Sequence, residues 1–120
     1  MRKIKTPEEI AIMRKLARIA DQSINEAFAA MRAADSEMDI ASALTSGIYT
    51  HGAEYFKLMI IATGERSVFP NVGPTTRRLQ GGDVCRVEVF PMIGGGKDAV
   101  KRSVERYIAI VEGDGTAEQI

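Results

Sequence analysis

A carboxylate in the middle of an apolar strand is the residue that could do chemistry most directly. From Val84 to Phe90 the sequence has strand periodicity, which places Glu88 on the same face as Arg86. Glu88 stands between two valines, and a buried carboxylate needs a partner or a raised pKa. The simpler interpretation is that its face is solvated, or that it pairs with Arg86 or with Arg102 across the sheet. We favour that interpretation over a catalytic role.

Other polar side chains gather at the turns around this strand. The run Gly94–Gly96 is not a phosphate-binding loop, because neither a Lys-Ser/Thr pair nor a helix start follows it. Taken by themselves, the polar groups predict no specific reaction. They are Asn71, Arg77, Arg78, Lys97, Asp98, Lys101 and Arg102.

The single histidine and the single cysteine add little. His51 has no second His or Cys with which to share a zinc ion, so we expect a local helix cap or a solvent-exposed ring. Cys85 cannot form an internal disulfide, which favours a reducing, cytoplasmic setting. On a buried strand such a cysteine usually acts as a small hydrophobic side chain.

The charge balance argues against nucleic acid as a partner. Sixteen basic and sixteen acidic residues cancel, and a net charge near zero gives little resistance to self-association. No apolar run approaches the roughly 18 residues needed to span a bilayer. The N-terminus also lacks the apolar middle of a signal peptide. We therefore expect a cytoplasmic protein that binds neither nucleic acid nor membranes.

Two helices are expected ahead of the strand. The Thr-Pro-Glu-Glu run at residues 6–9 is typical of a helix start, with a capping box and a proline in the first turn. Apolar residues three and four apart then predict an amphipathic helix from Pro7 to about Arg32. Ser36 opens a second capping pattern, and that helix is expected to end near Gly52. The short connection requires an antiparallel or sharply crossed helix pair.

Strands follow the helices. Tyr55–Ala62 is mostly apolar, and the hairpin that begins at residue 84 should return from about Val100 to Val111. Pro91 should end the first hairpin strand, bulge it or lie at a sheet edge. The polar tail after Gly113 is expected to be frayed. This order predicts one domain over residues 1–120, an α+β fold with helices on one face of an antiparallel sheet.

Three segments of the chain resemble one known family. The first helix of the "pita-bread" domain, shared by methionine aminopeptidases, proline-specific aminopeptidases and creatinases, is similar to KTPEEIAIMRKLARIAD at residues 5–21. That domain's next strand, turn and loop resemble HGAEYFKLMIIATGERSVFPNVGPTTRRLQGGD at 51–83, and its creatinase-type variant resembles FPMIGGGKDAVKRS at 90–103. The resemblance implies a half pita-bread, in which two helices pack on an antiparallel β-sheet, corresponding to the N-terminal of two similar halves.

The resemblance also indicates the family's catalytic positions, and this chain departs from each. The catalytic histidine falls on Asn71, which cannot act as a general base near neutral pH. The first metal-binding aspartate falls on Glu88, which is one methylene longer. The second falls on Ala99, as in creatinases, and the neighbouring Asp98 should face the other side of its strand. We predict degenerate catalytic positions at Asn71 and Glu88, with no metal or other cofactor.

Two functions remain open. The first is a creatinase- or Xaa-Pro dipeptidase-like hydrolase of C–N amide-type bonds, catalytically inactive as this half-domain. The alternative is a non-catalytic protein-binding module on the same scaffold. In either case a half pita-bread would expose a sheet edge and an apolar face, which are association sites. We expect a homodimer or a missing second half as partner, and a small peptide or an amidine-like molecule as ligand.

Overall fold

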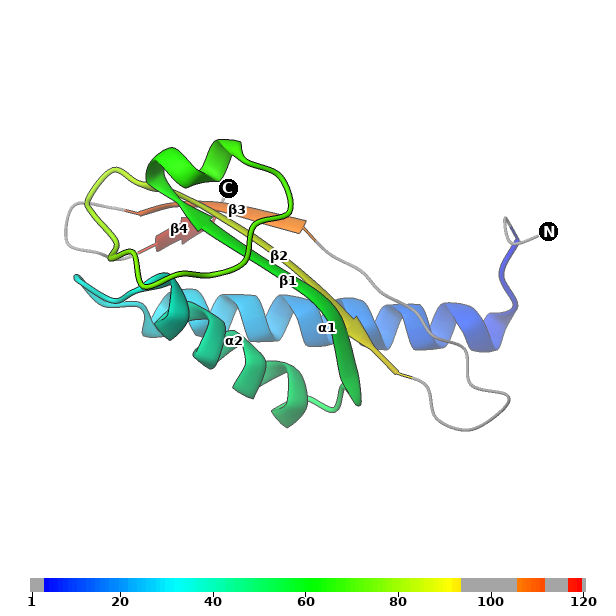
Figure 1. Cartoon of the computed structure of the whole chain (residues 1–120). Coiled ribbons are helices and arrows are strands. Elements are labelled where there is room, and N and C mark those ends of the chain that lie inside the picture. The colour runs from blue at the N-terminus through cyan, green and yellow to red at the C-terminus, as the bar shows by residue number, and fades with distance from the viewer. Residues whose placement is uncertain (1–3, 94–105, 112–116, 120) are drawn as a thin grey trace.

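The structure is a computed structural model that describes residues 4–93, 106–111 and 117–119. Two helices lie along one side of the strands, and a short 3-10 helix with the loop after it lies largely on the other (Figure 1). The elements in chain order are α1 (Pro7–Ala30), α2 (Glu37–Thr50), β1 (Tyr55–Thr63), the 3-10 helix η1 (Gly64–Val68), β2 (Val84–Met92), β3 (Arg106–Val111) and β4 (Ala117–Gln119).

Both helices begin with the capping boxes that the sequence predicts. The Thr6 hydroxyl accepts from the Glu9 amide, and the Glu9 carboxylate accepts from the Thr6 amide. Ser36 and Asp39 repeat this exchange at α2. Each helix ends about two residues earlier than predicted. Extended backbone at Met31 (φ −60°, ψ 136°) stops α1, because that conformation cannot continue an α-helix.

The two helices pack closely on one another through small residues. A Cβ atom added to Gly47 of α2 would lie 3.1 Å from the Cβ of Ser23 of α1. Around this contact the helices bury an apolar stripe, as the predicted spacing of three and four requires. The largest of these buried side chains are Leu16, Ile24, Leu44 and Ile48.

The strands form one antiparallel sheet in the order β1-β2-β3-β4. Pro91 lies within β2, opposite Phe56, and the β1–β2 register shifts between Phe56 and Met59. The irregularity that Pro91 predicts is therefore present beside it. The predicted return strand is observed from Arg106; its expected start at Val100 lies outside the described residues.

The expectation of a frayed tail is wrong for its last described residues. Ala117–Gln119 form β4, which pairs antiparallel with β3, and Ala117 lies opposite Val111. Polar composition suggested a free end, but pairing with a neighbouring strand satisfies backbone groups whatever the side chains are.

The core lies between the helices and one face of the sheet. On β2 this face carries Cys85, Val87 and Val89, each at most 1% exposed, and these side chains belong to the same apolar cluster as the helices. The opposite face of β2 carries Arg86 and Glu88. In the part of the chain that the structure describes, no helix is long and apolar enough to cross a membrane.

Candidate functional site

Glu88 is buried on the sheet face away from the helices. Only 2% of its surface is exposed, so the expected solvated face is wrong. The other part of that expectation holds, because Oε1 of Glu88 accepts hydrogen bonds from Nε of Arg86 at 2.9 Å and from Nη2 at 2.5 Å. The pair runs along one strand, since residues two apart share a face. The alternative partner, Arg102, lies outside the described residues.

Asn71 lies in the exposed loop between η1 and β2. Its φ is 54°, in the left-handed region that Asn tolerates better than most residues. The loop is tied to β2 two residues earlier, where the Phe69 carbonyl accepts from Nη1 of Arg86 at 3.2 Å. Arg86 therefore links the two sequence-predicted positions, since it contacts Glu88 directly and holds the loop that carries Asn71.

A second buried carboxylate, Glu37, organises the other end of the same loop. Its side chain is fully buried at the first residue of α2. Oε1 accepts from the amide and hydroxyl of Thr63 at 2.9 and 2.8 Å. Oε2 accepts from the amide and hydroxyl of Thr75, both at 2.8 Å, and from Nη1 of Arg66. One carboxylate thus joins α2, the end of β1, η1 and the loop.

These donors decide the charge state of Glu37. Burial alone would raise the pKa of this carboxyl group. The hydroxyls of Thr75 and Thr63, the Thr75 amide and the Arg66 guanidinium oppose burial and together lower the pKa below its ordinary value. Glu37 is therefore ionised at neutral pH despite its burial.

Sequence reasoning missed Glu37. An acidic residue in the first turn of a helix is ordinary, because it interacts favourably with the helix dipole. The available signal was Thr63, which ends an apolar strand and needs a hydrogen-bond partner if buried, whereas Thr75 lies in an exposed loop and gives no such signal. Neither spacing nor periodicity connects them to residue 37.

A third ion pair lies beside the Glu37 cluster. Nη1 of Arg77 is 2.6 Å from Oδ2 of Asp83 and 3.0 Å from Oγ1 of Thr63, and Nη2 is 2.9 Å from the Glu65 carboxylate. Hydrogen bonds that Arg77 donates to the carboxylates of Asp83 and Glu65 raise the pKa of Arg77. Gly64 leaves room for this arrangement, since a Cβ there would lie 2.3 Å from Nη2 of Arg77.

His51 forms the local helix cap that the sequence predicts, and its ring makes a further contact that the sequence does not predict. It is the C-terminal cap residue of α2, and Nε2 of its ring lies 2.9 Å from the Glu26 carboxylate of α1. The expected local cap is confirmed, since the His51 amide donates to the Gly47 and Tyr49 carbonyls. The ring contact is additional, because the helix pair brings the Glu26 carboxylate within reach. His51 therefore joins the two helices and is not part of the Arg86–Glu88 cluster.

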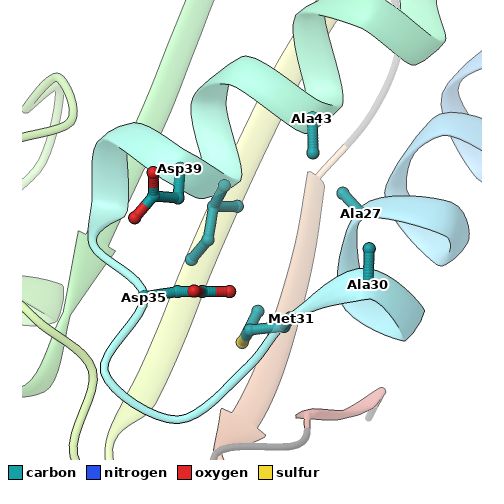
Figure 2. Close-up of a pocket in the computed structure, with 7 residues that line it drawn as sticks. Ala27, Ala30, Met31, Asp35, Asp39 and Ala43 are labelled. Carbon is teal, nitrogen blue, oxygen red and sulfur yellow. The ribbon is translucent and has the colours of Figure 1, made fainter.

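A shallow pocket between the end of α1 and the start of α2 holds two further carboxylates (Figure 2). Oδ2 of Asp35 accepts from the Arg32 amide at 2.6 Å, and Oδ2 of Asp39 accepts from the Ser36 amide at 2.7 Å. The pocket floor consists of apolar side chains, among them Met31. These aspartates cap backbone amides around the helix connection, on the helical side of the sheet.

The fold and the site can be compared with known proteins. A model of metallopeptidase family M24 matches residues 11–107. The chain belongs to family M24. An uncharacterized peptidase of Bacillus subtilis is 30% identical over 89 residues, and a Xaa-Pro dipeptidase of Pyrococcus furiosus is 31% identical over 90 residues. These matches cover 73% and 74% of this chain but 25% and 26% of the relatives.

Solved prolidase and dipeptidase structures share the fold. The prolidase from Pyrococcus furiosus superposes on 98% of this chain with a TM-score of 0.74 and 24% identity, and the match covers 33% of that structure. The dipeptidase PepE from Mycobacterium ulcerans gives a TM-score of 0.77 at 19% identity, over 93% of this chain and 29% of its own. The predicted α+β half pita-bread is confirmed. The chain spans about a quarter of the length of its curated relatives.

The M24 family name implies a metal ion, so the fit of a metal at Glu88 can be examined. Oε1 of Glu88 accepts two hydrogen bonds from Arg86, and a metal ion there would have to displace a guanidinium group. Residues 4–93, 106–111 and 117–119 contain no group of three or more His, Cys, Asp or Glu that could hold a metal. Ala99, the remaining predicted position, lies outside these ranges. The described residues do not fit a metal centre.

Proposed function

We propose that this chain is one lobe of a creatinase- or Xaa-Pro dipeptidase-like M24 hydrolase, and that it does not cleave C–N bonds by itself. The Arg86–Glu88 pair carries the proposal. Glu88 has the position at which the family resemblance implies a metal ligand, and its carboxylate faces a guanidinium group of its own strand. Because arginine stays charged at all accessible pH values, its ion pair with Glu88 does not open by deprotonation of the guanidinium group. A guanidinium group also does not bind and activate a water molecule as a metal ion does.

The other candidate nucleophilic and basic groups that the sequence analysis considered support the same conclusion. Asn71 carries an amide, which cannot act as a general base near neutral pH. Burial, followed by the negative charges of Glu37 and Asp83, raises the pKa of the Cys85 thiol to about 12, and this side chain belongs to the core. His51 is held by Glu26 at the end of α2. A small peptide could still be recognised by the donor and acceptor of the exposed Asn71 amide, whereas an amidine-like ligand would compete with Arg86 for Glu88.

The second lobe is proposed to be another copy of the chain. Beside the loop, Val68 is 76% exposed and Phe69 is 55% exposed, and Tyr55 and Leu58 of the edge strand β1 are also exposed. Exposed apolar side chains next to an open strand edge favour association, and the zero net charge does not oppose it. Gel filtration with light scattering at micromolar concentration should show a dimer; a monomer would contradict this part of the proposal.

Activity tests the central claim. The purified chain is assayed against Xaa-Pro dipeptides and creatine, with and without Mn²⁺, and a thermal-shift titration with Mn²⁺ runs in parallel. We expect turnover no greater than the blank and no metal-dependent rise in Tm. Turnover well above the blank, or a saturable Mn²⁺ shift that E88Q removes, would overturn the proposal.

A non-catalytic binding module is the second candidate, and the exposed Val68 and Phe69 favour it. Such a module needs a surface and no reactive groups, which the described residues satisfy equally well. The lone cysteine supports a reducing, cytoplasmic setting for either function. A monomer without hydrolytic activity would favour the binding module over the paired lobe.

A further inference from the structure

The loop from Phe69 to Arg78 is held near both of its ends by buried carboxylates. At its start, the Phe69 carbonyl is bound by Arg86, whose partner is Glu88. At its end, the amide and hydroxyl of Thr75 are bound by Glu37. Asn71 lies between these two anchors with its left-handed backbone.

Arg66 extends the Glu37 anchor into the middle of the loop. Its Nη1 donates to Oε2 of Glu37, and its Nη2 donates to the Gly73 carbonyl at 3.0 Å. Glu37 therefore fixes residue 75 directly and residue 73 through Arg66. Since Gly73 is two residues from Asn71, the position of the Asn71 side chain depends on this chain of contacts.

We propose that Glu37 is the positioning residue of the ligand-facing loop: its carboxylate sets the conformation of residues 70–75 and thereby where Asn71 points. This inference rests on the proposed function for the loop's role as a ligand surface. The geometry requires a carboxylate, since both oxygens accept and five donors converge on them. A glutamine would direct an NH₂ group at donors on one of its two sides.

Backbone contacts make the expected effect specific. The Met38 amide donates to the Thr75 carbonyl at 3.1 Å, and the Glu37 amide donates to the Arg77 carbonyl at 3.0 Å. These bonds do not involve side chains and should persist when the Glu37 carboxylate is altered. When the carboxylate is altered, we therefore expect added backbone motion mainly in residues 70–74. Residues 75–77 should stay bound to the start of α2.

Backbone ¹⁵N relaxation of the full chain tests this inference. Pro70 and Pro74 have no amide, so the probes are the amides of residues 71, 72 and 73. In the wild type we expect order parameters of about 0.8 or more, falling below about 0.6 in E37Q. Relaxation on this timescale does not respond to a loss of global stability while the chain stays folded. L44A, which removes a core side chain away from the loop, controls for that loss.

A second pair of variants covers the case in which E37Q fails to fold. Thr75 is exposed, and T75V removes the hydroxyl that bonds Glu37 whereas T75S retains it. We expect lower order parameters at residues 71–73 in T75V than in T75S. A rigid loop in folded E37Q, equal loosening in L44A, or T75V matching T75S would overturn the inference. Turnover assays on the same samples test the proposed function separately, because the relaxation result does not depend on activity.

Discussion

Glu37 and Glu88, the two buried carboxylates among the residues that the structure describes, contact arginine side chains in different ways. Glu37 binds donors from three segments that are distant in the sequence, so its charge connects a helix, a strand and a loop. Glu88 pairs with Arg86, two residues earlier on the same strand. Equal burial therefore accompanies different roles. The origin of these donors distinguishes a carboxylate that joins distant segments from one that accepts hydrogen bonds from an arginine of its own strand.

Removing the charge of Glu37 should have the largest effect. E37Q keeps the volume but sets an NH₂ group against two or three donors in a buried site. Breaking a buried charge network in this way costs about 3–5 kcal/mol. Urea denaturation monitored by circular dichroism measures the loss. The matched control is E65Q, which removes a carboxylate that pairs with Arg77 but is 75% exposed, and it should leave the midpoint nearly unchanged. Equal losses of unfolding free energy in E37Q and E65Q would contradict the claim that burial makes the Glu37 carboxylate more important than the exposed Glu65 carboxylate.

The Arg86–Glu88 pair should couple more weakly. In a double-mutant cycle of R86Q, E88Q and R86Q/E88Q, each single variant leaves the other side chain without its charged partner in a largely buried site. We expect a coupling energy of about 1–3 kcal/mol. Additive effects in the urea midpoints would show that the two side chains act independently, and the argument that Arg86 blocks a metal at Glu88 would then fail.

Sequence patterns identify Glu88 as unusual but not Glu37, for a physical reason. In the alternating sequence of β2, a charged residue between apolar residues is easily recognised, and the alternation also places Arg86 on the same face. Glu37 occupies a position where acidic residues are ordinary. Its partners Thr63 and Thr75 are 26 and 38 residues away, and local patterns carry no information about such contacts.

The fold itself was largely predictable, since it depends on local signals. Capping boxes located both helix starts, an apolar run located β1, and a two-residue period located β2. The error at β4 arose where a tertiary contact overrides local preference, because β3 offers a pairing edge. The contact of His51 with Glu26 was not predicted either, because it depends on the two helices running side by side.

Gly64 tests how tightly the surroundings of Glu37 are packed. Its φ is +55°, and a Cβ would lie 2.3 Å from Nη2 of Arg77 and 2.8 Å from Oδ1 of Asp83. G64A should therefore lose about 1–2 kcal/mol from backbone strain, and more from displacing the ion pair. G52A shows the cost of backbone strain without crowding, since Gly52 has nothing within 4 Å, and its φ of +103° is less accessible to alanine than +55°. If G64A costs no more than the roughly 1–2 kcal/mol of backbone strain in urea denaturation, crowding at Arg77 is unimportant.

Acid should separate the wild type from E37Q. The pKa of Glu37 in the folded chain lies below its ordinary value of 4.5, since the hydrogen bonds to the carboxylate outweigh burial. Ionised Glu37 therefore contributes stability that is complete above about pH 4.5 and is lost as the pH falls through the folded pKa. Urea midpoints between pH 6 and pH 3 should fall more steeply for the wild type than for E37Q. Parallel slopes would mean that Glu37 does not titrate differently on folding.

The smallest effect should come from Cys85, which reports the charge of Glu37. Burial is the main reason that the pKa of this thiol is about 12, and the negative charges of Glu37 and Asp83 add to it. At pH 8 the native thiolate fraction should be roughly a thousandfold below that of an ordinary cysteine, so iodoacetamide should react slowly until urea unfolds the chain.

Neutralising Glu37 should lower that pKa and speed native alkylation by about two- to fivefold in E37Q, whereas E88Q should match the wild type. L44A controls for reaction through transient unfolding, because it destabilises the chain without changing any charge near the thiol. If L44A accelerates alkylation as much as E37Q does, the reagent reaches Cys85 by opening of the core. The rate then measures stability and says nothing about the field of Glu37.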